Sequence, residues 1–170
     1  MLKIQTILHP TDFSEGSDPA FRLACSLARD HGARLIVLHV IPAPVLVAGG
    51  DPVAAQIIQE FYNQQQEKLG RLRTIDSRVP VEHQLANGDP VAEILRVASD
   101  TNCGMIVMGT HGLSGLKRAL MGSVAEGVTR EAPCPVVIVK ASFSETSARD
   151  ASAASRPAEP DRPAGLVQTP

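Results

Sequence analysis

The sequence predicts an α/β protein built on a three-layer, doubly wound, five-stranded parallel sheet with helices on both faces. Strand-like runs of Leu, Ile and Val alternate along the chain with amphipathic helical patterns, and the connections between them are short. This order is typical of parallel sheets covered by helices. The run at residues 34–40 is nearly continuous in Leu, Ile and Val, which suits a strand buried on both faces.

Strands are expected where short apolar runs are bounded by Gly, Pro or polar residues. The run at 79–85 alternates apolar and polar residues, which places it nearer an edge of the sheet. The last run is Val136–Val139, and we expect it to end the sheet. In full, the expected strands span residues 4–9, 34–40, 79–85, 105–108 and 136–139.

The first two expected helices follow the first two strands. One spans residues 15–31 and ends at Gly32, and its apolar face holds Phe21, Ala24, Cys25 and Ala28. The other is longer and follows a stretch rich in Pro, Ala and Gly that runs to Asp51. We expect its Gln and Glu side chains to lie in water and its buried face to hold Ile57, Ile58, Phe61, Leu69, Leu72 and Ile75.

The last two expected helices begin at recognisable start signals. Asp89 suits the N-cap of one and Pro90 its first position, and its apolar face holds Val91, Ile94, Leu95 and Ala98. The other begins after Gly122, with Ser123 as N-cap or in the first turn and Glu126 in the opening turn. One face of it holds Val124, Gly127 and Val128.

Composition sets bounds on the function. A chain of 170 residues predicts one domain with a sizeable core. The 16 basic and 18 acidic residues are interspersed and give a net charge of −2, so neither nucleic acid nor a membrane surface is expected as a partner. The sequence shows no secretory signal or membrane span, and we expect a cytoplasmic protein.

The composition changes near residue 141. From there on Ala, Ser, Pro and charged side chains predominate. Such a segment buries too little apolar surface to offset its ordering entropy. We therefore expect a folded domain over residues 1–140 and a disordered tail over 141–170.

Several chemistries are excluded by missing motifs. The sequence has no Gly-x4-Gly-Lys-Ser/Thr, no Gly-x-Gly-x-x-Gly and no Gly-x-Ser-x-Gly, which argues against Walker-type hydrolases, dinucleotide sites and α/β-hydrolases. Cys25, Cys103 and Cys134 lack metal or disulfide-framework spacing and are expected to be reduced, packed thiols. His39 closes a buried strand, where a satisfied core histidine is the commoner role.

The most informative motif lies between the fourth strand and the last helix. Gly109-Thr-His-Gly112 is followed nine residues later by Gly122-Ser123. Glycines let backbone N–H groups approach an anion closely, and a helix N-terminus adds about half a positive charge and unpaired donors. The pattern predicts a phosphate site that needs no catalytic side chain. Ordinary turn glycines and a simple N-cap remain the alternatives.

Four further residues are candidates for ligand binding, and each also has an ordinary structural explanation. Asp12 follows the first strand, where its carboxylate suits a ribose hydroxyl or a metal-bound water, or equally a cap for the helix that starts near Ser14. His111 suits a phosphate or ribose, and Lys117 and Arg118 suit phosphate oxygens. Histidine and basic side chains are also common in solvated loops.

Three separated segments, in the expected order, resemble the nucleotide-binding universal stress proteins. They are Gly-x2-Gly-x9-Gly-Ser at 109–123 with the trailing Pro-Cys-Pro-Val-Val-Ile-Val at 133–139, Ile-Leu-His-Pro-Thr-Asp-Phe-Ser at 7–14, and Leu-His-Val at 38–40. The resemblance covers roughly residues 1–140. It implies the strand order 3-2-1-4-5, in which Asp12 and Gly109 face each other across one cleft.

The resemblance also implies the ligand and its contacts. The ligand would be ATP, ADP or AMP, with Mg²⁺ as an optional companion of the phosphates. Asp12 would lie by the adenine and ribose, and backbone groups of Val40 would contact the adenine edge. A homodimer would form through Val136–Val139. The complete implied site is Pro10, Thr11, Asp12, Val40, Met108, Gly109, His111, Gly112, Gly122, Ser123 and Val124.

Three functions are compatible with these residues. A nucleotide-dependent stress regulator with slow or no hydrolysis is favoured, because no general base other than Asp12 is evident near the cleft. A Mg²⁺-dependent ATPase or phosphotransferase that uses Asp12 is the second. A nucleotide-free dimeric interaction module is the third, and the glycine motif argues against it, because the corresponding branches of the family lack that motif.

Overall fold

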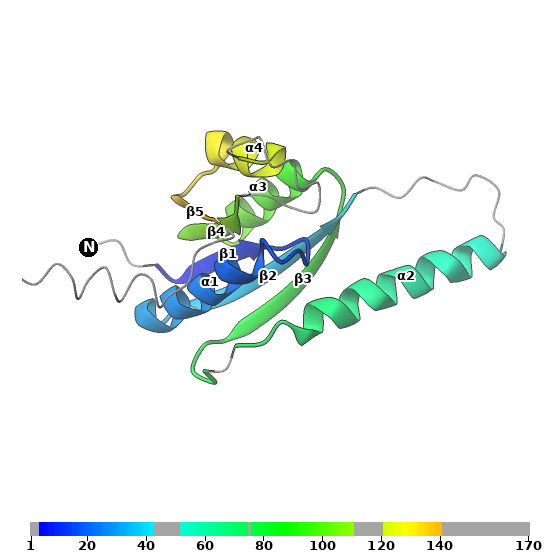
Figure 1. Cartoon of the computed structure of the whole chain (residues 1–170), viewed down its shortest axis with the longest axis horizontal. Helices are drawn as coiled ribbons and strands as arrows, with labels where there is room; N and C mark the ends of the chain where they lie inside the picture. Colours follow the sequence, from blue (N-terminus) through cyan, green and yellow to red (C-terminus); the bar gives the residue numbers. More distant parts are fainter. Residues whose placement is uncertain (1–3, 43–51, 75, 111–120, 141–170) are drawn as a thin grey trace, which may run out of the picture.

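The structure is a computed structural model that describes residues 4–42, 52–74, 76–110 and 121–140. The expectations for His111, Gly112, Lys117, Arg118, Ile75 and the tail at 141–170 lie outside the described residues. Within these ranges the chain forms one parallel sheet in the order β3-β2-β1-β4-β5, which confirms the predicted fold (Figure 1). The elements are β1 Thr6–Pro10, α1 Asp18–His31, β2 Arg34–Ile41, α2 Pro52–Arg71, β3 Val81–Asn87, α3 Pro90–Asp100, β4 Met105–Gly109, α4 Ser123–Glu131 and β5 Val136–Val139.

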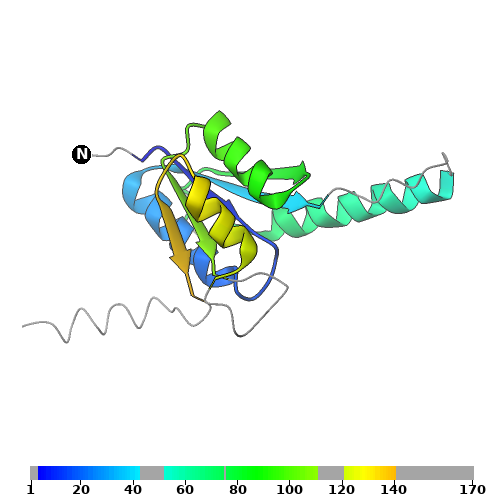
Figure 2. The same cartoon turned by 90° about the horizontal axis from the view of Figure 1, so that it is seen from above.

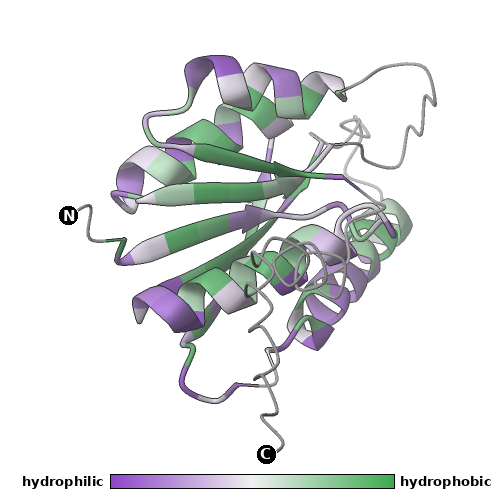
Figure 3. Ribbon diagram, turned by 60° about the vertical axis from the view of Figure 1, so that its left-hand side comes forward, coloured by the Kyte–Doolittle hydropathy of each residue, from purple (hydrophilic) through white to green (hydrophobic). Residues whose placement is uncertain are grey.

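The helices cover opposite faces of the sheet in pairs, with α3 and α4 on one side and α1 and α2 on the other (Figures 1 and 2). Successive strand residues point to opposite faces, so the core has two halves. Ile7, Leu35 and Val37 pack with the alanines of α1, whereas Leu8 and Ile36 pack with α3 and α4. The strands form the apolar centre of the molecule (Figure 3).

Helix α1 begins three residues later than predicted. Residues 14–17 form a turn in which Ser17 N–H donates to the Ser14 carbonyl at 2.9 Å. The helix then starts at Asp18 and ends at Gly32, whose φ of 61° suits glycine. Its most buried face holds Pro19, Ala20, Ala24 and Ala28, with the predicted Phe21 and Cys25 only partly buried beside it.

The prediction for α2 is wrong in part. Leu69 is buried as expected, but Ile57 and Phe61 are 65% and 45% exposed. Gln65, expected in water, is buried. The cause is that α2 packs on the sheet through its C-terminal half, while its N-terminal half extends beyond the sheet (Figure 2).

Helix α4 packs closely against α3 at a glycine. A Cβ on Gly127 would lie 2.9 Å from Cγ2 of Val91, which is closer than carbon atoms approach without displacement. The absence of a side chain at residue 127 therefore allows the close approach of α4 to α3, and with it the placement of the first turn of α4.

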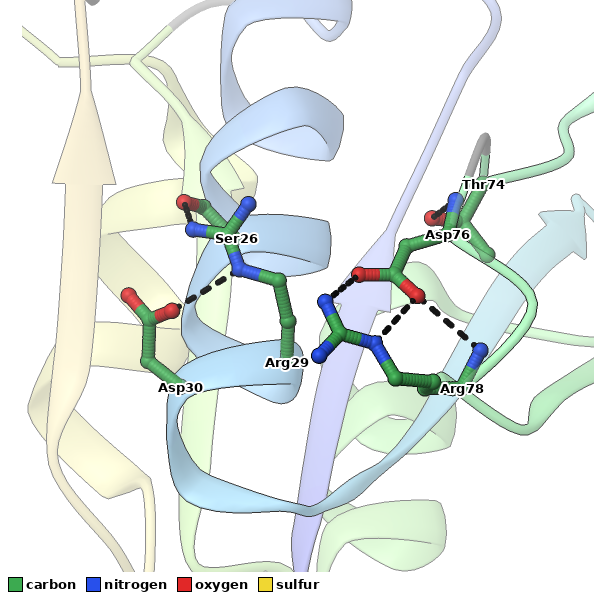
Figure 4. Close-up of polar contacts among 6 residues, drawn as sticks. All are labelled: Ser26, Arg29, Asp30, Thr74, Asp76 and Arg78. Carbon is green, nitrogen blue, oxygen red and sulfur yellow. Dashed lines mark hydrogen bonds and ion pairs between the residues drawn. The ribbon is translucent and has the colours of Figure 1, made fainter.

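The amino-terminal edge of the sheet carries ion pairs (Figure 4). Before β3, Asp76 accepts hydrogen bonds from Arg78, which hold the pKa of its carboxyl at about 2. Near the end of α1, Arg29 pairs with Asp30 at 2.9 Å. These contacts are exposed and lie at the edge opposite the carboxyl ends of the strands, where such ion pairs contribute little to stability.

The structure also describes the state of the cysteines and the character of the helices. None of Cys25, Cys103 and Cys134 is in a disulfide, and burial raises the pKa of the Cys134 thiol to about 12. In the ranges that the structure covers, every helix is too short or too polar to cross a membrane.

Candidate functional site

A pocket of about 400 Å³ opens at the carboxyl ends of the strands, a volume within the range of small-ligand sites. It lies where β1 and β4 are neighbours while their helices cover opposite faces, the point at which doubly wound sheets bind ligands. Its lining comes from the ends of β1, β2 and β4 and from the first turns of α3 and α4. The lining residues are Pro10, Thr11, Asp12, Ser17, Leu38, His39, Val40, Pro42, Pro90, Ile94, Met108, Gly109, Thr110, Gly122, Ser123, Val124 and Ala125.

The pocket exists because β1 and β4 stop pairing. Their register ends at Leu8↔Ile106. The next bond of a parallel ladder would run from the N–H of residue 10 to the carbonyl of Val107. Residue 10 is proline, which has no N–H. That carbonyl instead accepts a hydrogen bond from Nδ1 of His9 at 2.9 Å.

His9 is fully buried and heads a chain of hydrogen bonds. With Nδ1 protonated, Nε2 accepts from the Ser17 hydroxyl at 3.4 Å. Ser17 Oγ in turn lies 2.9 Å from Thr11 Oγ1, which accepts the N–H of Phe13 at 3.1 Å. The chain connects β4 to the loop that lines the pocket. In the described parts of the chain, every fully buried side-chain nitrogen or oxygen has a partner.

The charge state of His9 follows from its burial. Burial lowers the pKa of His9 from 6.5 to about 4, and the bond to Val107 and the charges of Asp12 and Asp18 offset only part of that effect. His9 is therefore neutral at pH 7, and Nδ1 carries its proton because a carbonyl can only accept.

The loop after β1 turns sharply at the pocket. Asp12 Oδ1 accepts hydrogen bonds from the N–H and the hydroxyl of Ser14, at 3.1 and 2.6 Å. Asp12 therefore closes a turn ahead of α1 and lines the pocket as well. The N-cap of α1 is Ser17, so Asp12 does not cap this helix, and the expectation that it does is wrong.

His39 is half-buried and lines the pocket, so the predicted core position is only partly confirmed. Its Nδ1 donates to the carbonyl of Thr11 at 2.8 Å, and the ring packs against Phe13 with centroids 4.3 Å apart. Burial lowers the pKa of His39 below its ordinary value.

Backbone direction distinguishes Val40 from its neighbours. The Leu38 carbonyl accepts from Thr11 N–H, on the β1 side, whereas the Ile41 carbonyl accepts from Gly88 N–H, on the β3 side. Because backbone groups alternate along a strand, those of Val40 face the β1 side. Pairing with β1 ends at Leu38, so Val40 presents them beyond the end of β1, at the pocket.

The two helices that begin at the pocket differ in their caps. Helix α3 is capped by Asp89, whose carboxylate accepts from Ala92 N–H at 2.9 Å. Helix α4 has Gly122 as its N-cap, so no side chain of the cap residue accepts its first N–H groups. Gly122 N–H donates to the Thr110 carbonyl at 2.7 Å, which fixes the helix start beside the end of β4. Ser123 is therefore the first helical residue, which confirms the first-turn position and not the N-cap position among the two predicted for it.

The structure brings the described members of the predicted site to this one pocket. They are Pro10, Thr11, Asp12, Val40, Met108, Gly109, Gly122, Ser123 and Val124. Residues that sequence reasoning did not assign to the site also line it: Ser17, Leu38, His39, Pro42, Pro90, Ile94, Thr110 and Ala125. The starts of α3 and α4 lie at the same edge of the sheet. The predicted helix start at Asp89-Pro90 could therefore have indicated that α3 also lines the pocket.

Metal-binding groups are sparse. Among the residues placed by the structure, no three His, Cys, Asp or Glu side chains converge on a common point. Asp12 is the one carboxylate among the lining residues.

Fold and pocket together define a doubly wound α/β protein with a ligand pocket at its topological switch point. A profile of the Universal stress protein family matches residues 3–140, and the chain belongs to that family. Universal stress protein MJ0531 of Methanocaldococcus jannaschii is 33% identical over 137 residues, which cover 79% of this chain and 81% of the relative. Universal stress protein YxiE of Bacillus subtilis is 34% identical over 139 residues, 76% of this chain and 94% of the relative.

Solved structures show the same fold. Protein MJ0577 of Methanocaldococcus jannaschii superposes with a TM-score of 0.70 and 28% identity, over 81% of this chain and 96% of that one. A universal stress protein crystallised in complex with cAMP superposes with a TM-score of 0.56 and 26% identity, over 82% of this chain and 99% of that one.

The buried neutral His9 predicts acid sensitivity. The free energy of unfolding should be level above pH 7 and fall as the pH drops from 6.5 toward 4, because the unfolded chain binds a proton at residue 9 that the native protein excludes. The contribution of this group should approach roughly 1 kcal/mol per pH unit. Urea unfolding at several pH values measures it. The His9→Asn variant should be less stable at pH 7 and show a shallower decline, whereas identical slopes would contradict the assignment.

Proposed function

We propose that this protein binds ATP or a related adenine nucleotide in the pocket and acts as a nucleotide-dependent regulator in a stress response, with slow or no hydrolysis. The observation that carries the proposal is the start of α4. Its first N–H groups lie in the pocket lining behind a glycine cap, beside a second glycine at the end of β4. Such donors and the helix dipole favour phosphate.

The glycines fit this role because their backbone does not require glycine for another reason. In the described ranges, the glycines with positive φ are Gly32 and Gly88. Gly122 has φ −74° and ψ 156°, a conformation open to any residue. The missing side chains at Gly109 and Gly122 would let a ligand approach the backbone closely.

The rest of the pocket suits a nucleoside. Leu38, Met108 and Val124 supply apolar walls for a base, and the backbone of Val40 supplies a donor and an acceptor for its edge. Asp12 supplies an acceptor for a ribose hydroxyl. The family member solved with cAMP supports an adenine nucleotide as the ligand class.

Binding is favoured over catalysis by the state of the nearby groups. His9 uses both ring nitrogens in the buried chain, and His39 uses Nδ1 on Thr11. Asp12 already accepts two hydrogen bonds from Ser14. One carboxylate and a triphosphate suit Mg²⁺, which commonly binds through one or two carboxylates plus phosphate oxygens. The proposal places the protein in the cytoplasm, where ATP is available.

Adenine nucleotides should stabilise the purified protein. The melting temperature should rise with ATP concentration, because a ligand that binds the native state adds about 2.7 kcal/mol of stability at 100 times its Kd. Differential scanning fluorimetry with ATP, ADP, AMP, cAMP and GTP measures the effect and ranks the ligands. The proposal fails if no adenine nucleotide at millimolar concentration shifts the melting temperature.

A negative charge at the start of α4 should separate binding from folding. Ser123 is an exposed first-turn residue, so Ser123→Glu should leave the fold as stable or more stable by about 0.3–1 kcal/mol through the helix dipole. The carboxylate would repel phosphate, and the Kd for ATP should rise about tenfold or more.

The matched control is Ala92→Glu, which adds the same charge to the exposed first turn of α3, outside the pocket lining. Calorimetry should find its ATP affinity unchanged. If Ser123→Glu bound ATP as tightly as the wild type, the start of α4 would not be part of the phosphate site.

We further propose a homodimer through β5, which lies at an edge of the sheet. The carbonyls of Pro135 and Val139 accept bonds from β4, so the backbone of Ile138 faces outward. Such an edge is a template for pairing with a second strand.

Ile138→Pro should therefore give a monomer, because it removes an outward N–H and leaves the bonds to β4 in place. Light scattering of the wild type and the variant measures the change. Val137→Pro is the contrasting variant and should destabilise the sheet itself. A wild-type monomer at micromolar concentration would disprove the dimer.

A further inference from the structure

Phe13 adopts a backbone conformation that bulky residues rarely adopt. Its φ is +62°, in the left-handed region, where a Cβ crowds the backbone. Asn102, at φ +48°, is of a residue type that tolerates this region. A phenylalanine remains there only where its surroundings hold it, and such positions concentrate at functional sites.

The imidazole of His39 contacts both Thr11 and Phe13, the residues on either side of Asp12. Its Nδ1 donates to the Thr11 carbonyl at 2.8 Å. Its ring packs against the ring of Phe13, with centroids 4.3 Å apart and planes at 38°. The Phe13 N–H also donates to Thr11 Oγ1, at 3.1 Å, which closes the turn on itself.

The residue between these two anchors is Asp12. Thr11 and Asp12 line the pocket, whereas Phe13 packs against the core on the α1 side of the sheet. At the left-handed turn, the chain passes from the pocket, where Asp12 lies, to the core on the α1 side, where the Phe13 side chain packs. The conformation of Phe13 therefore sets the position of Ser14, whose N–H and hydroxyl hold the Asp12 carboxylate.

We propose that His39 is a positioning residue, which holds Phe13 in the left-handed conformation and thereby fixes the Asp12 carboxylate for a ribose hydroxyl of the bound nucleotide. The inference rests on the proposed function and adds a residue that acts through the loop rather than through the ligand. His39 extends from β2, and Asp12 follows β1, so the device couples two neighbouring strands.

His83 provides a matched control. It donates from Nε2 to the carbonyl of Leu72 at 2.7 Å, a bond of the same kind in an exposed position on β3, outside the pocket lining. His39→Leu and His83→Leu each remove one ring-to-carbonyl bond. Only the first is expected to affect the nucleotide.

The affinities for ATP and for 2′,3′-dideoxy-ATP, measured by calorimetry, test the proposal. His39→Leu should weaken ATP binding about five- to thirtyfold, the population factor that disfavours the left-handed conformation for a residue with a Cβ. It should leave dideoxy-ATP binding unchanged, because that ligand lacks the hydroxyls that Asp12 would accept. His39→Asn keeps a donor and His39→Phe keeps a ring, so each should show a smaller loss.

Phe13 gives a second readout of the same conformation. Phe13→Gly enters the left-handed region freely, whereas Phe13→Ala does not. Phe13→Gly should bind ATP more tightly than Phe13→Ala, because glycine adopts the left-handed conformation without a steric cost.

The outcomes separate the two proposals. A wild type that binds ATP together with an unchanged His39→Leu overturns the positioning role alone. Equal losses for ATP and dideoxy-ATP, or tighter binding by Phe13→Ala than by Phe13→Gly, also overturn it. A wild type that binds no adenine nucleotide overturns both. Selective loss for ATP, with His83→Leu unchanged, supports the role of His39.

Discussion

A single hydrogen bond, from Nδ1 of His9 to the carbonyl of Val107, holds β1 to β4 where their backbones part. Proline at residue 10 cannot continue the ladder, so without this bond a buried carbonyl would lose its partner, at a cost of about 1–3 kcal/mol. The imidazole replaces the missing N–H and lets the strands separate without that cost. The pocket is the space that this separation leaves at the carboxyl ends of the strands.

The helix ends give this space its character. In a parallel sheet, the helices that follow strands all begin at the carboxyl edge, so their dipoles converge there. At α3 the carboxylate of Asp89 satisfies the first turn. At α4 the cap residue has no side chain to do so. The site therefore has a polarity, with apolar walls around the strand ends and backbone donors at one side. This arrangement favours recognition of an anionic group attached to a flat, apolar body.

Sequence patterns predicted the order of the elements well because a sheet buried on both faces leaves clear marks. The apolar run of β2, the Asp89-Pro90 start of α3 and Gly32 at the end of α1 are all local signals. Helical periodicity was less informative for α2. It identifies residues that share a face, such as Ile57 and Phe61, but not whether another element covers that face.

The residues of the candidate site also fall into two groups, those in local motifs and those brought in by long-range packing. Its glycines and the loop after β1 belong to local motifs, and they were found from the sequence. Ile94 and Ala125 enter the pocket through the packing of whole helices, which no short motif records. His9 has no local sign of its role either, because its partner lies 98 residues further along the chain. Contacts of that range depend on the completed sheet.

The close contact between Gly127 and Val91 has a mechanical consequence. Helix α4 has nine residues and is about 13 Å long, so a shift at one residue displaces the whole helix. It crosses α3 at Gly127, about one turn from the residues of its first turn that line the pocket. An added methyl at Gly127 would require Val91 or α4 itself to shift. Ligand affinity would then depend on a packing detail one turn away from any ligand atom.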